Sequence, residues 1–237
     1  MTFDVFCIRE IGESGNEAMY PTVGAEGPLT TEPLDGDRPQ HLVAHSLSVR
    51  EAGGPNARTV FELREIRADI LITEARVALV CAKYDKGGGW VGSPGTALAL
   101  NAVSKIRAAR RSRGKVLAGH IRYPWLASVA FSPKQGWLDE EAVRFAVRDG
   151  TANPARLLVV ELGLPKETDS AAVARAIMLR AVAYRTKHDT LADDDLAGFR
   201  QLADAPEPPR PQPRKFAAYT MPTSWHAMPG TAYPEPA

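Results

Sequence analysis

The 237-residue chain contains only two cysteines, and no apolar run in it approaches the roughly 20 residues that a membrane-spanning helix needs. Its first residues hold neither the basic stretch nor the continuous apolar stretch of a secretion signal. Cys7 and Cys81 could pair, but each stands in its own strand-like segment, where a buried reduced thiol is the usual outcome. These absences argue against a disulfide framework and a helical membrane protein, and they predict a soluble cytoplasmic protein.

The chain also lacks the local motifs of hydrolases, redox enzymes and zinc sites. His41 and His45 have no pattern of cysteines or carboxylates around them that would complete a metal site. The glycine-rich segment 87–92 lacks the lysine and hydroxyl residue that end a phosphate-binding P-loop, so we interpret it as a turn. We therefore predict no metal, no cofactor and no catalytic residue, with one alternative left open, an enzyme whose site is assembled only by the fold.

Acidic residues are absent from Lys86 to Leu138, although the whole chain has a formal charge of only +1. Nine lysines and arginines give this acid-free block a charge of +9, which leaves −8 for the rest of the chain. Such a separation produces a local positive field that the near-neutral total hides. The candidate residues for binding an anionic partner are Lys105, Arg107, Arg110, Arg111, Arg113, Lys115 and Arg122.

Several interpretations of this basic cluster stay open. Arginine offers a planar set of donors that fits phosphate and carboxylate oxygens, so the cluster predicts contact with a phospholipid surface or an acidic protein. Nucleic acid is an alternative partner, because Tyr123 and Trp125 follow the cluster and could stack on bases. In the plainest interpretation the cations cover a solvated helix end, where positive charge is favourable, and both aromatic residues belong to the core.

Apolar periodicity predicts strands in most of the chain before Pro165. A helix is expected at residues 95–113, where apolar residues recur three and four positions apart. A second helix is expected to begin after the cap formed by residues 168–170 and to end near His188. The predicted strands cover residues 3–11, 41–49, 69–73, 77–82, 116–123, 126–131, 142–149 and 156–162.

Composition divides the chain into three parts. Residues 1–40 hold a strand and then many glycines and prolines, which predicts an N-terminal arm that either belongs to the fold or hangs from it. Residues 41–203 hold the main domain, with the basic helix 95–113 as an insertion. Residues 204–237 contain nine prolines and few aliphatic residues, which cannot bury enough surface to offset the entropy of ordering. We predict a disordered tail, in which Trp225 is a candidate docking residue.

Two segments carry a family resemblance. Residues 71–77 follow a Leu-x-Thr-x-x-Arg-hydrophobic pattern between two predicted strands, and residues 120–129 place an isoleucine, a proline and an aromatic residue before a valine. In these segments the chain resembles bacterial pleckstrin-homology-like and GRAM-like domains of the actinobacterial type. The resemblance covers residues 41–188 and implies an α+β fold, a bent antiparallel sheet or barrel closed by a C-terminal helix. It also implies a binding or adaptor module, for lipid head groups, peptides or other proteins, without fixed catalytic residues.

Overall fold

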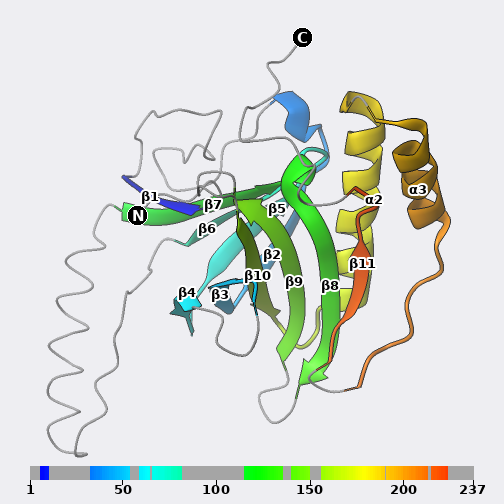
Figure 1. Ribbon diagram of the computed structural model, residues 1–237. Helices are drawn as coiled ribbons and strands as arrows, with labels where there is room; N and C mark the ends of the chain where they lie inside the picture. Colours follow the sequence, from blue (N-terminus) through cyan, green and yellow to red (C-terminus); the bar gives the residue numbers. More distant parts are fainter. Residues whose placement is uncertain are drawn as a thin grey trace, which may run out of the picture.

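The computed structural model describes residues 6–10, 33–53, 59–64, 66–81, 115–135, 140–149, 156–189, 191–212 and 215–223. Within these residues the protein is a mixed α+β fold of two antiparallel sheets and two α-helices (Figure 1). The predicted α+β class is therefore confirmed. The two sheets do not close into a single barrel in the described part of the chain.

The first sheet has five antiparallel strands in the order β1-β7-β6-β5-β2. Its strands are β1 (Phe6–Glu10), β2 (Gln40–Ala44), β5 (Ala68–Ile72), β6 (Arg76–Cys81) and β7 (Lys115–Arg122). The central strand β6 is buried along its whole length, on both faces of the sheet. A strand that is covered on both faces usually consists of apolar residues throughout, and β6 does so apart from Arg76.

The second sheet has six antiparallel strands in the order β11-β8-β9-β10-β3-β4. In β9, Val143, Phe145 and Val147 are buried, while the residues between them stay partly exposed, which confirms the predicted alternation. The strands are β3 (Ser46–Glu51), β4 (Thr59–Leu63), β8 (Leu126–Gln135), β9 (Glu140–Asp149), β10 (Arg156–Leu164) and β11 (Ala217–Thr220).

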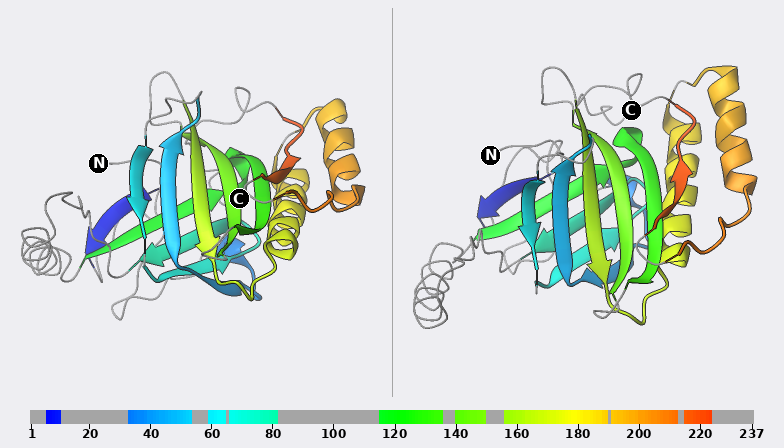
Figure 2. Two further views of the ribbon diagram at one scale, coloured as in Figure 1. Left: turned by 90° about the horizontal axis from the view of Figure 1, so that it is seen from below. Right: turned by 60° about the horizontal axis from the view of Figure 1, so that its bottom comes forward.

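Two segments of the chain pass directly from one sheet to the other. β2 continues into β3 with only His45 between them, and β7 continues into β8 through the short 3-10 helix η2 (Tyr123–Trp125). All three residues of η2 are buried. The strands of the two sheets cross at a large angle (Figure 2), and corners of this kind are how strands change sheets in such packings.

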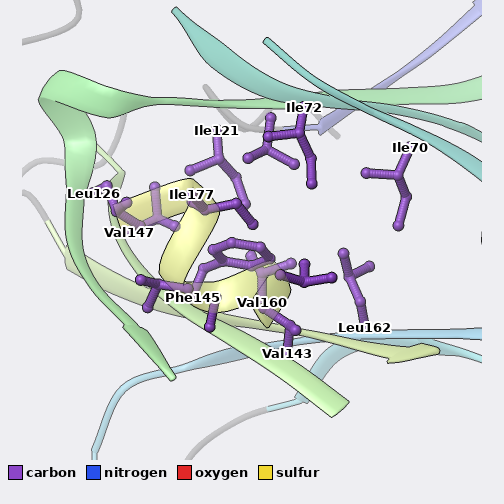
Figure 3. Close-up of a cluster of buried hydrophobic side chains, with 14 of the residues drawn as sticks. Ile70, Ile72, Ile121, Leu126, Val143, Phe145, Val147, Val160, Leu162 and Ile177 are labelled. Atoms are coloured by element: carbon purple, nitrogen blue, oxygen red, sulfur yellow. The ribbon is translucent and has the colours of Figure 1, made fainter. Parts of the chain in front are cut away.

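The hydrophobic core lies between the facing sheets. Ile70, Ile72 and Ile121 of the first sheet meet Phe145 of the second, and Ile177 closes the cluster from a helix (Figure 3). The cavity left among these side chains has a volume of only about 10 Å³, about what one water molecule needs. This part of the interior is therefore filled by the protein's own side chains and does not hold a ligand.

Two helices follow β10. Helix α2 (Ser170–His188) packs against β8, β9 and η2, and helix α3 (Asp193–Asp204) packs on α2. The predicted cap is present, because the Asp169 carboxylate accepts hydrogen bonds from the backbone N–H groups of Ala171 and Ala172. The predicted helix ending near His188 is thus confirmed. Neither described helix is long and apolar enough to cross a membrane.

The chain departs from the predicted domain boundaries at both ends. The prediction of a disordered tail is wrong for residues 217–220, because β11 pairs with the edge of β8 and Tyr219 is buried. A strand edge supplies backbone partners, so this segment orders with few aliphatic residues of its own. Near the other end, the 3-10 helix η1 (Pro33–Asp35) belongs to the fold, since Asp35 is fully buried. The inserted helix 95–113 and Trp225 lie outside the described residues.

Candidate functional site

A buried ion pair joins η1 to the turn between β5 and β6. The Arg76 guanidinium donates from Nε to Asp35 Oδ1 at 3.0 Å and from Nη2 to Asp35 Oδ2 at 2.7 Å. Both side chains have 0% exposure, and the Thr73 hydroxyl donates to the same carboxylate at 2.7 Å. A two-pronged pair of this kind fixes the orientation of both groups as well as their separation. It therefore attaches the η1 loop rigidly to the first sheet.

The aromatic residues of the β7–β8 corner complete this buried polar network. The Tyr123 hydroxyl donates to the Thr73 carbonyl at 2.7 Å, and His120 Nδ1 lies 3.5 Å from Arg76 Nη1. Burial raises the pKa of Tyr123 well above its ordinary value of 10.0, although the nearby Arg180 guanidinium acts in the opposite direction. The phenol is therefore a neutral donor. Because its side chains are buried, the network holds in place the surface formed by the η1 loop and the β5–β6 turn.

That surface is one wall of an open groove with a volume of about 540 Å³. Helix α2 forms the opposite wall. The groove is within the size range of small-ligand sites, and it combines apolar with charged side chains. Its apolar lining comprises Leu34, Leu179, Ala183 and Tyr184, and its polar lining comprises Arg38, Glu74, Arg180, Lys187 and His188.

Most of the positive charge that the described residues give the groove comes from α2. This helix contains no aspartate or glutamate. Two of its arginines are engaged elsewhere, since Arg175 donates to the Ala205 carbonyl and Arg185 pairs with Asp189. Arg180 and Lys187 instead face the groove, seven positions apart and so on one side of the helix. The surplus charge of α2 is therefore directed into the groove.

Arg180 is a positioned cation. Its Nη1 donates to the Ile72 carbonyl at the end of β5, which holds the guanidinium against the wall of the groove. Among the described residues, no carboxylate lies within ion-pair distance of Arg180, Arg38 or Lys187. Glu74 is the one acid among the described residues that line the groove, and its side chain lies over Gly36. In the part of the chain that the structure describes, the groove lining thus contains three arginines and lysines and one carboxylate.

The apolar lining of the groove includes one exposed large side chain. Leu179 is 38% exposed and is the one large apolar side chain classed as exposed in the described part of the chain. Next to it, the Tyr184 ring packs on the His188 ring with centroids 4.6 Å apart, and it also meets the Tyr123 ring edge-on, with centroids 6.2 Å apart. An exposed apolar residue beside cations suits a ligand that has an anionic and an apolar part.

The predicted anion site is only partly within the described residues. Lys105, Arg107, Arg110, Arg111 and Arg113 lie outside them, and Lys115 is the first residue of β7. Arg122 is only 4% exposed, so the prediction that it lies on a solvent-facing basic surface is wrong. It ends β7 opposite Arg76, at the buried corner that leads into η2. The sequence of the basic cluster gives no sign that Arg122, one of its residues, lies at a buried corner between two strands.

The sequence does carry one overlooked signal for the groove. Arg180 and Lys187 are spaced i and i+7, with Tyr184 between them at i+4, so two cations and an aromatic ring lie on one side of α2. Arg38 and Glu74 carry no comparable signal, because only the folded chain brings η1 and the β5–β6 turn next to α2.

Comparison with protein-family models, with curated proteins and with solved structures finds no match to this chain.

Proposed function

We propose that this protein is a non-enzymatic binding or adaptor module that holds an anionic partner in the groove between α2 and the η1 loop. The observation that supports this most is Arg180, which a backbone carbonyl holds in place without a carboxylate partner among the described residues. A cation fixed in advance loses little side-chain entropy when an anion arrives. The chemistry of the groove lining is ion pairing and apolar contact, which serve binding.

The acid-free block adds to this proposal. Lys105, Arg107, Arg110, Arg111 and Arg113, with the neighbouring Lys115, supply most of its positive charge. In the proposal, their field attracts an anionic partner over distances of up to about 10 Å, the screening length in about 0.1 M salt. The groove then provides the contacts at short range.

Two finer assignments remain part of the proposal. The corner at η2 and the helix that follows the last core strand support a pleckstrin-homology-like arrangement, although the described sheets do not close into a barrel. An experimental structure would overturn it if the strands could not be superposed in sequence order on such a domain. The low cysteine content supports a cytoplasmic location.

Binding of short poly-L-glutamate, measured by calorimetry at low and at moderate salt, tests the function. We expect binding that weakens with salt and falls about tenfold in the double variant Arg180→Gln/Lys187→Gln, since each ion pair contributes up to about 1 kcal/mol. The matched control is Lys166→Gln/Arg200→Gln, which removes the same charge from two exposed residues away from the groove lining. Equal weakening in both double variants would show that only net charge matters and would refute the groove.

A further inference from the structure

We infer that the groove recognises an extended peptide segment of a partner protein, in which an apolar residue stands beside the first of two acidic residues about three positions apart. This inference rests on the proposed function and names the partner's chemistry. It starts from the shape of the site, which is concave. A bilayer surface reaches side chains that project from a protein, whereas Arg38 and Arg180 line the opposing walls of a groove.

The length of the groove sets the length of the segment. Leu179 and Lys187 are eight positions apart on α2, which corresponds to about 12 Å along the helix axis. A peptide in the extended polyproline II conformation, which rises about 3.1 Å per residue, covers that distance with about four residues. Arg180 and Lys187 are about 10 Å apart along the same axis, which is about three residues of a polyproline II chain. This conformation has three residues per turn, so two acidic side chains three positions apart point to the same side and match the two cations.

The apolar contacts fix the direction and the position of the segment. Leu179 and Ala183 lie on one row of α2, and Leu34 faces them from η1. An apolar side chain next to the first acid reaches these residues while that acid pairs with Arg180. Leu179, which is 38% exposed, would then be covered.

Glu74 should make the groove bind a peptide in preference to a simple anion. Its carboxylate lies in the groove lining and would repel phosphate or a lipid head group. A peptide also carries backbone N–H groups, and each can donate to a carboxylate. The one acid of the groove is therefore unfavourable for a ligand that is only anionic and favourable for a peptide.

The test uses three probes. The first is a capped seven-residue peptide with two glutamates three positions apart and a leucine before the first of them. The second is an isomer of equal composition with adjacent glutamates and the leucine at the far end, and the third is inorganic pyrophosphate. We expect the first peptide to bind at least fivefold more tightly than its isomer. Replacing Leu179 by Ala should remove most of that difference, and Arg38→Gln should weaken both peptides about threefold.

We expect the substitution Glu74→Ala to weaken the binding of the first peptide and to strengthen the binding of pyrophosphate. Equal affinity for the two peptides, or peptide binding that is unchanged or stronger in Glu74→Ala, would overturn the inference. Selective binding to anionic vesicles without peptide binding would also overturn it, in favour of a lipid surface. If poly-L-glutamate and both peptides bind Arg180→Gln/Lys187→Gln as tightly as the parent protein, the proposed function itself fails.

Discussion

Removing the carboxylate of Asp35 is expected to be among the most damaging single changes in the described part of the chain. Asp35 and Arg76 are fully buried, and the carboxylate also accepts the Thr73 hydroxyl. In Asp35→Ala the guanidinium stays inside the protein without this counter-charge. Burying a charge in that way is costly, because the unfolded chain would return it to water.

Breaking a buried ion pair from one side costs about 3–5 kcal/mol. That is a large part of the roughly 5–15 kcal/mol by which folded domains are stable. For a chain of this size each kcal/mol lowers the melting temperature by about 2–4 °C, so we expect a fall of about 6–20 °C. The double variant Asp35→Leu/Arg76→Met removes both charges and should recover most of the loss, since replacing a buried pair by apolar residues is often close to neutral.

Urea unfolding followed by circular dichroism measures these differences. Arg64→Ala is the control, because Arg64 also pairs with a carboxylate, Glu62, but has 77% side-chain exposure. Exposed pairs contribute about 0–1 kcal/mol, so this variant should unfold almost like the parent protein. The reasoning is refuted if Asp35→Ala costs no more than Arg64→Ala, or if the double variant is less stable than either single variant.

Two further changes test the same region. The raised pKa of Tyr123 means that above its ordinary value of 10.0 only the unfolded chain ionises this phenol, so stability is full below about pH 10 and is lost as the pH rises further. We expect Tyr123→Phe to remove about 1 kcal/mol of the alkaline loss between about pH 10 and pH 11, measured by urea unfolding, and an unchanged slope would contradict this. Gly36 has a φ of 72°, and a Cβ there would lie 2.5 Å from Glu74 Cδ. Gly36→Ala should therefore cost about 1–2 kcal/mol and should displace Glu74, with the same opposite effects on peptide and pyrophosphate as Glu74→Ala; a variant as stable as the parent protein would show that the loop is not held in this conformation.

The strands of the core could be predicted from the sequence because their burial pattern is local. β9 alternates and β6 is apolar throughout, so each strand is visible in its own residues. β11 was missed for the opposite reason. Its four residues, Ala217–Thr220, carry little apolar signal, and their order depends on an edge of β8 that lies far away in the sequence. The helix α3 was also missed, although Leu196, Phe199 and Leu202 recur three positions apart in it and Phe199 is fully buried.

The candidate site was less predictable than the fold. Thr73 and Arg76 belong to the motif that carried the family resemblance, and the structure places both in the buried network. Their partner Asp35 stands in a segment rich in glycine, proline and acidic residues, where one carboxylate cannot be distinguished from its solvated neighbours. A search for charge runs finds cations that are close together in the sequence, whereas Arg38 and the two cations of α2 are far apart in it. Long-range pairing of this kind is decided by topology.

The position of β11 has a consequence for how the protein is made. Ala217 pairs with Phe131, so β8 leaves the ribosome long before the strand that covers its outer edge. Until then β8 presents a row of unsatisfied backbone groups, which is a template for pairing with other chains. Chains interrupted after α2 would keep that edge exposed, and nascent chains would rely on chaperones to shield it. The four residues of β11 thus determine whether this edge of the second sheet is covered or is open to aggregation.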